Sequence, residues 1–111
     1  MTLQEQRDGS EVHFTSIAEV MERVDPTRIS IIPLLEGDAG TTYLVVWPPN
    51  TDTPCEHGGK EERAFIIDGE IIDEDGKRHG PGDVWLRGPH AQHHPRSGPA
   101  GARLLLRQDP V

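Results

Sequence analysis

One stretch of the sequence, Thr53–Gly69, concentrates side chains that bind metal ions. Cys55 and His57 lie two residues apart, so in extended backbone their side chains leave from the same face. Glu62 would point the other way from a straight strand, but Gly58-Gly59 permits a turn or bulge between them. A thiolate, an imidazole and a carboxylate that converge on one point would form a metal pocket. The alternative is a polar loop at the entrance of a strand, because short motifs often match by chance.

Histidines cluster in a second stretch further along the chain. Four of the six histidines fall between positions 79 and 94, and these are His79, His90, His93 and His94. His93 and His94 are adjacent, so an extended segment can direct only one of them inward. The alternative is a histidine-rich surface loop, and the number of histidines does not choose among the four.

The composition indicates one small domain that is rich in β-structure. The 111 residues include ten prolines and twelve glycines, which favour frequent turns over long helices. Apolar residues make up only 33% of the chain, but they cluster in strand-like runs, as in a folded domain.

Charge and cysteine content limit the expected partners and location. The formal net charge of −8 predicts no binding to nucleic acid or to an anionic membrane surface. The single cysteine excludes an intrachain disulfide. We find no signal peptide and no apolar run long enough to cross a bilayer, so a cytoplasmic location is expected.

The first part of the chain predicts a tail followed by a short helix. Residues 1–12 are polar and charged, so we expect a loosely ordered tail, with a single domain over 13–111. Ser16 and Glu19 have the spacing of a capping box, and apolar residues recur at helical intervals after Ser16. A helix is therefore predicted over 16–24, ending before Asp25-Pro26 and covering one edge or end of a sheet.

The rest of the chain predicts short antiparallel strands separated by turns. Six runs have strand character: Ile29–Leu35, Thr41–Trp47, Glu62–Ile67, Glu70–Asp73, Val84–Arg87 and Ala102–Arg107. Pro33 predicts an edge strand or a bulge, and Asp68-Gly69 predicts a two-residue hairpin. In the last run, Ala102, Leu104 and Leu106 share one face. The pattern predicts an all-β sandwich or barrel.

Both clusters of polar residues resemble the two sequence motifs of the cupin family. Cys55-x-His57-x4-Glu62-x6-Gly69 has the spacing of the first motif, G-x5-H-x-H-x3–4-E-x6-G. Gly82-x5-Gly88 followed by Pro89-x3-His93 resembles the second motif, G-x5-P-x-G-x2-H. The run from Glu61 to Ser97 is more narrowly similar to cupins related to the sensor domain of ChrR-type anti-sigma factors, a subgroup that includes acetylacetone-cleaving and dihydroxyacetophenone-cleaving dioxygenases.

The resemblance covers about residues 28–107 and implies both a fold and a ligand set. The fold would be a cupin-type antiparallel β-barrel, also called a jelly roll or double-stranded β-helix, with a short N-terminal helix. The metal ligands would be the residues that match the motifs: Cys55, His57, Glu62 and His93. Cupins of this kind are commonly dimers through sheet contacts, so the resemblance also implies a homodimer.

Two positions depart from the family pattern. Cys55 stands where the motif has its first histidine, and His90 stands where the family usually keeps a glycine. A cysteine thiolate can replace a histidine ligand, and it favours Fe or Zn, with Cu, Ni and Mn as further alternatives, over Mg²⁺. In the opposite interpretation, Cys55 is a small buried apolar residue and the site has lost its metal. His90 would supply a replacement ligand or a proton-transfer group.

Other polar and aromatic side chains receive ordinary structural roles. We expect Arg63 and Arg87 to be solvated and to face outward. Three histidines are expected on the surface: His13, His79 and His94. Four aromatic residues are expected in the core or a subunit interface: Tyr43, Trp47, Phe65 and Trp85.

The resemblance implies a metal-dependent enzyme acting on a small carbonyl, diketone or sugar-like compound. Glu62 or His90 would move protons, and the chemistry would be that of a dioxygenase, an isomerase or a lyase, because the fold does not fix the reaction. The alternatives are a non-catalytic ligand-sensing or metal-binding module and a metal-free cupin.

Overall fold

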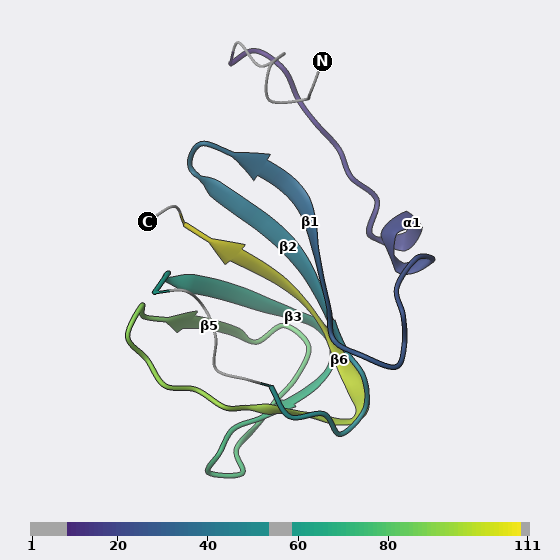
Figure 1. The fold of residues 1–111 in the computed structure, drawn as a ribbon, viewed down its shortest axis with the longest axis vertical. Helices are drawn as coiled ribbons and strands as arrows, with labels where there is room; N and C mark the ends of the chain where they lie inside the picture. Colours follow the sequence, from purple (N-terminus) through teal and green to yellow (C-terminus); the bar gives the residue numbers. More distant parts are fainter. Residues whose placement is uncertain (1–8, 54–58, 110–111) are drawn as a thin grey trace.

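The computed structural model describes residues 9–53 and 59–109, which form one antiparallel sheet with a short helix before it (Figure 1). The helix is α1 (Ile17–Met21), and the strands are β1 (Ser30–Gly37), β2 (Gly40–Trp47), β3 (Glu62–Ile72), β4 (Arg78–His79), β5 (Val84–Arg87) and β6 (Arg96–Gln108). Their order in the sheet is β1-β2-β6-β3-β4, and β5 also pairs with β3. The predicted antiparallel all-β architecture with a short N-terminal helix is confirmed. Within the described residues, the sheet is not closed into a barrel by strand pairing.

The first two strands form a hairpin. β1 and β2 are antiparallel and end at the facing pair Gly37 and Gly40. The register shifts between Pro33 and Leu35, which confirms the bulge predicted there, because proline has no N–H to donate to a neighbouring strand. β1 has β2 as its only neighbour in the order of the described strands, so it is an edge strand.

The hairpin predicted at Asp68-Gly69 is wrong, because these residues lie inside β3. The strand continues through both residues, and its register with β6 shifts there instead of reversing. Gly69 has a φ of 79°, and a Cβ at this position would overlap the carbonyl oxygen of Gly101 and lie 2.7 Å from Cα of Ala102. Glycine is therefore needed for a bulge that packs against β6, not for a turn. A tight turn at Asp75-Gly76 joins β3 to β4 instead.

Helix α1 is shorter than predicted but begins as its sequence indicates. The hydroxyl of Ser16 accepts a hydrogen bond from the backbone N–H of Glu19 at 3.3 Å, which caps the helix. None of the helical residues is buried. Met21 and Val24 line a small cavity together with Trp47 of β2. In the described part of the chain, no helix has the length and apolar character that crossing a membrane requires.

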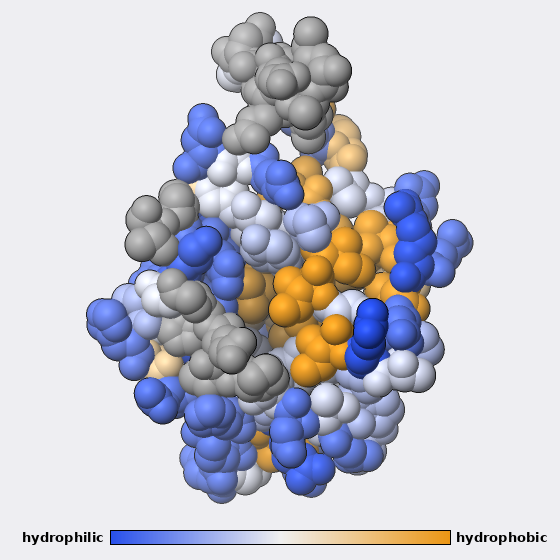
Figure 2. Space-filling view, viewed as in Figure 1, coloured by the Kyte–Doolittle hydropathy of each residue, from blue (hydrophilic) through white to orange (hydrophobic). Residues whose placement is uncertain are grey.

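The two faces of the sheet differ in character. The core face carries a buried cluster, which contains Val45, Trp47, Ile66, Ile71, Ala102 and Leu104, with Tyr43, Trp85 and Leu106 packed against it. The predicted alternation along 102–107 and the core positions of Tyr43, Trp47 and Trp85 are therefore confirmed. Apolar side chains also gather near the middle of the view in Figure 2, over the region where β1, β2 and β6 lie side by side.

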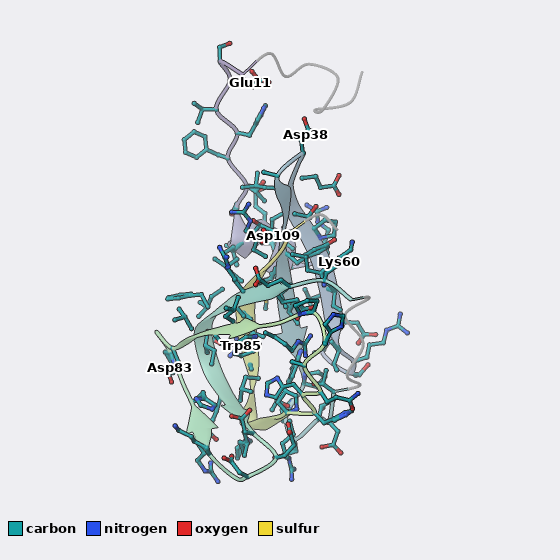
Figure 3. All side chains as sticks on the ribbon, turned by 90° about the vertical axis from the view of Figure 1, so that its left-hand side faces the viewer. Glu11, Asp38, Lys60, Asp83, Trp85 and Asp109 are labelled. Atoms are coloured by element: carbon teal, nitrogen blue, oxygen red, sulfur yellow. The ribbon has the colours of Figure 1, made fainter. Side chains whose placement is uncertain are left out.

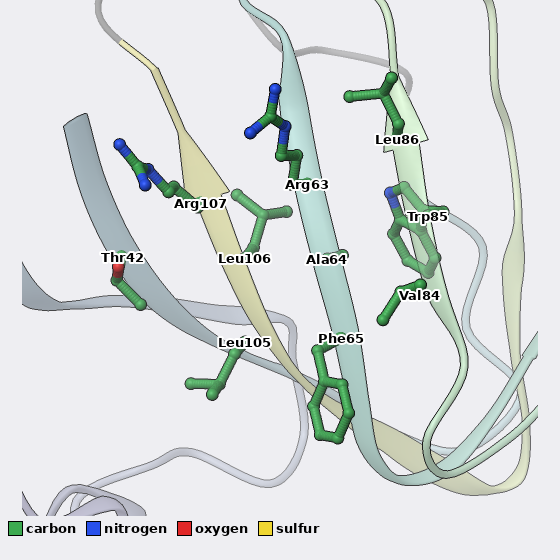
Figure 4. A pocket seen from close by; sticks show the side chains of 10 residues that line it. All are labelled: Thr42, Arg63, Ala64, Phe65, Val84, Trp85, Leu86, Leu105, Leu106 and Arg107. Carbon is green, nitrogen blue, oxygen red and sulfur yellow. The ribbon is translucent and has the colours of Figure 1, made fainter. Parts of the chain in front are cut away.

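The opposite face carries side chains that the core does not cover. Phe65 is 43% exposed, so it is not a core residue. Val84 and Leu86 are also exposed, whereas Trp85 between them packs against the core on the other face. These residues and Arg63 line an open cavity of about 640 Å³ (Figure 4).

Candidate functional site

Glu62 is a buried carboxylate at the start of β3. Its register places it opposite Arg87 of β5 on one side and Gln108 of β6 on the other. The guanidinium of Arg87 donates a hydrogen bond to Oε2, and the amide of Gln108 donates to Oε1 at 2.7 Å. Glu62 is only 3% exposed, so its charge is balanced by a neighbour in the sheet and not by water.

The prediction that Arg87 is solvated is wrong. Its side chain is 11% exposed, because its place opposite Glu62 turns it toward the core face. Arg63 does face outward as predicted, with a side chain that is 60% exposed and lies 3.4 Å from the carboxylate of Glu61. Alternation along β5 carried a signal for this difference, since Arg87 lies two residues after Trp85 and therefore shares the core face with it.

A cavity of about 340 Å³ opens beside Glu62 on the core face. Its lining is mainly apolar and aromatic, with a few polar side chains: Ile31, Tyr43, Val45, Trp47, Thr53, Glu62, Trp85, Arg87, Pro95, Leu104, Leu106 and Gln108. Three buried polar atoms of lining residues have no hydrogen-bond partner among the described residues: Thr53 Oγ1, Trp85 Nε1 and Arg87 Nε. Buried donors are rarely left unpaired, so these atoms mark the cavity as a place for a hydrogen-bonding ligand.

His93 lies in the loop between β5 and β6, beside a second cavity. Its ring packs edge-on against Trp85, with ring centroids 6.0 Å apart. The second cavity has a volume of about 300 Å³, and Trp85 and Arg87 line both cavities. Figure 3 shows the sheet turned by 90°, with Trp85 and Asp83 labelled on and beside β5. The two cavities therefore adjoin the same strand.

Asp73 joins two histidines, one of which was expected on the surface. Its Oδ1 lies 2.6 Å from Nε2 of His93, and its Oδ2 lies 2.7 Å from Nε2 of His79. Burial raises the pKa of Asp73, but hydrogen bonds from His93 and His79 outweigh burial and hold this pKa below its ordinary value of 3.8. An ionised carboxylate only accepts hydrogen bonds, so each Nε2 is the donor. The side chain of His79 is 28% exposed, which corrects its assignment as a solvated residue.

The structure tests only part of the ligand set predicted from the sequence. Cys55 and His57 lie outside the described residues. Glu62 bonds Arg87 and Gln108, whereas His93 bonds Asp73, so these two predicted ligands have different partners here. His90 and His94 are exposed; His94 was expected on the surface, and this is confirmed.

Comparisons with known proteins identify the fold. Neither a protein-family model nor a curated protein matches the sequence. Among solved structures, an RmlC-like cupin protein from Desulfovibrio desulfuricans superimposes with a TM-score of 0.59 at 14% identity, covering 78% of this chain and 87% of that one. KdgF from Halomonas sp. does so with a TM-score of 0.69 at 17% identity, covering 91% and 96%. This chain is a small domain with the cupin fold.

A third cupin-like match comes from a regulatory complex. The crystal structure of Rhodobacter sphaeroides SigE in complex with the anti-sigma ChrR contains a chain that superimposes with a TM-score of 0.63 at 18% identity, covering 92% of this chain and 71% of that one. The resemblance to cupins noted in the sequence is therefore confirmed at the level of the fold. At these identities the matches carry no information on the reaction.

Within this cupin domain, the described residues offer one group of three metal-ligand types close together. Asp73, Glu74 and His93 each contribute an atom, and these atoms lie within 4.8 Å of one another. The sequence predicts Asp73 at the end of a strand, and its pattern gave no indication that Asp73 or Glu74 is a ligand. The proximity of His93, twenty positions further along, was the missing information.

Proposed function

We propose that this chain is a metal-binding cupin enzyme that acts on a small carbonyl, diketone or sugar-like compound. The observation that carries the proposal is the cavity beside Glu62, where Thr53, Trp85 and Arg87 each contribute a buried polar atom without a described partner. A ligand with several oxygen atoms would accept hydrogen bonds from all three, and its carbon skeleton would contact the apolar walls.

The proposed metal ligands are Cys55, His57, Glu62 and His93, with Fe or Zn as the ion. Glu62 fits this role, because ligating carboxylates are themselves held by hydrogen bonds, as Arg87 and Gln108 hold this one. A bound ion of this type would polarise a carbonyl oxygen of the ligand.

The protein residues around the cavity would orient the ligand and move protons. Arg87 and the indole N–H of Trp85 donate to ligand oxygens, and the apolar lining excludes water from the reacting atoms. Glu62, in the cavity wall, is the proposed base for a proton next to the bound carbonyl. His90 is exposed and lines neither the cavity beside Glu62 nor the cavity beside His93. Its proposed role in proton transfer therefore requires its imidazole to move into contact with the bound ligand.

The test combines metal analysis with a ligand screen. Protein purified without a histidine tag is analysed for bound metal, and oxygen uptake and product formation are followed with a panel of β-dicarbonyl compounds. Arg87→Lys is compared with Arg63→Lys, which makes the same change on the opposite face. Arg87→Lys should weaken ligand binding by about 10- to 100-fold, since it removes a charged hydrogen-bond donor from the cavity. Equal affinities of the two variants would refute the assignment of this cavity.

The alternative is a non-catalytic sensor or metal-binding module, and the structural likeness to a chain of the SigE–ChrR complex favours it. Ligand binding without turnover in the same screen would support this alternative. A homodimer and a cytoplasmic location remain predictions from the sequence; sedimentation analysis of the purified protein tests the first.

A further inference from the structure

Three segments that are distant in the sequence meet beside the end of β3. The turn between β3 and β4 carries Asp73 and Glu74, β4 supplies His79, and the loop between β5 and β6 supplies His93. The backbone N–H of His94 donates to Oε1 of Glu74 at 2.7 Å, which fastens the loop to the turn. The polar side chains of this cluster therefore face one another because of strand pairing and a loop contact, not because of their spacing in the chain.

We propose that this cluster binds a divalent transition-metal ion, with Asp73, Glu74 and His93 as its ligands. Nε2 of His93 lies 2.6 Å from Oδ1 of Asp73 and 3.9 Å from Oε1 of Glu74. Ligand atoms about 2.1 Å from a tetrahedral ion lie about 3.4 Å from one another. The observed separations bracket this value, so small side-chain rotations bring all three atoms to bonding distance.

His79 supports the site from outside the ligand set. Its Nε2 donates to Oδ2 of Asp73 at 2.7 Å, which leaves Oδ1 directed toward His93. Ligating carboxylates in metal sites are characteristically held by such second hydrogen bonds. The carboxylate of Asp73 is thus already oriented before an ion arrives.

The surroundings of the cluster favour a small, partly enclosed ion. The side chains of His93 and Asp73 are 22% and 28% exposed, and the cavity of about 300 Å³ beside them leaves room for water or another ligand. Two carboxylates balance the two charges of the ion, and the added imidazole favours Zn²⁺, Fe²⁺ or Mn²⁺ over Mg²⁺.

This site does not rest on the proposed function, but it shares His93 with it. In the described arrangement Nε2 of His93 faces Asp73. An ion at this site would therefore take His93 out of the four-ligand set given under the proposed function and leave the pocket ion with Cys55, His57 and Glu62. Three protein ligands and an open position are the usual arrangement of a catalytic zinc site.

Titration with Co²⁺ separates the two sites, because only an ion bound by Cys55 has a thiolate-to-cobalt charge-transfer band. The parent protein should bind two equivalents. The double variant Asp73→Asn/Glu74→Gln should lose one equivalent and keep the band, whereas Cys55→Ser should lose the band and keep one equivalent. His79→Ala should weaken the ion that shows no band by about 10- to 100-fold. Glu22→Gln, at an exposed position beside α1, is the control and should change nothing.

The opposite results are equally distinct. If Asp73→Asn/Glu74→Gln binds as many ions as the parent with the same affinities, the Asp73 site is overturned. If the parent shows no charge-transfer band yet loses an equivalent in this variant, the Asp73 site stands and the proposed pocket ligands fail. Paramagnetic Mn²⁺ added to Cys55→Ser gives an independent reading, since it should broaden the imidazole signals of His79 and His93; unbroadened signals count against the site even if the double variant is poorly folded.

Discussion

Replacing Arg87 tests whether a buried ion pair organises the cavity. Arg87→Met keeps the length of the side chain but removes the guanidinium that faces Glu62, leaving Gln108 as the only hydrogen-bond donor to this carboxylate among those described. Glu62 is 3% exposed, so contact with bulk water does little to replace the lost partner. Removing one member of a buried pair costs about 3–5 kcal/mol, a large part of the roughly 5–15 kcal/mol by which a domain is stable.

Urea unfolding of the metal-free protein measures this loss. At an m-value of about 2 kcal/mol/M, a loss of about 4 kcal/mol lowers the urea midpoint by about 2 M. Chelated protein is used because a bound ion would itself stabilise the folded state. Arg63→Met is the matched control: the side chain of Arg63 is 60% exposed, so the expected loss is below about 1 kcal/mol.

The double variant Arg87→Met/Glu62→Leu completes the experiment. It removes both charges and replaces them with apolar groups, so most of the lost stability should return. If Arg87→Met loses no more stability than Arg63→Met, the carboxylate of Glu62 is not buried with Arg87 in solution. If the double variant is no more stable than Arg87→Met, the loss comes from packing and not from an unpaired charge.

Three further predictions follow from the bulge, the Asp73 cluster and the sequence motif. Gly69→Ala should destabilise the protein by more than Gly76→Ala, because both glycines have positive φ but only at Gly69 would a Cβ overlap β6. Gly76→Ala should cost about 1–2 kcal/mol from its backbone conformation alone. Equal urea midpoints of the two variants would contradict the close approach of β6 to Gly69. The folded-state pKa of Asp73 lies below 3.8, so its contribution to stability is present above about pH 4 and is lost as the pH falls through the folded-state value. The melting temperature should therefore change less between pH 2 and 6 in Asp73→Asn than in the parent. His57→Ala should lower bound metal while Cys55→His retains it, since the latter restores the motif; metal-free Cys55→His from a metal-containing parent would mean that the motif is misaligned.

Local sequence patterns predicted most of the strands, because successive side chains of a strand point to opposite faces and the resulting alternation of apolar and polar residues is visible within a few positions. The run Thr41–Trp47 lies within β2, and the buried faces of Ala102 and Leu104 in β6 follow from their alternation. The same local reasoning failed at Asp68-Gly69. A glycine can permit a turn or a close approach to another strand, and the sequence around Gly69 does not distinguish the two.

Short alternating strands, a motif with Cys55, His57 and Glu62, and a cluster of histidines were enough to indicate the class of fold and the chemical types near the site. Which charged side chains contact one another depends on how the chain folds. Strand pairing places Arg87 against Glu62, and the β5–β6 loop brings His93 to Asp73, twenty positions away in the chain. Contacts of this kind depend on the register of the strands and on the path of the loops across the whole sheet. The spacing of residues within a short stretch of sequence predicts neither.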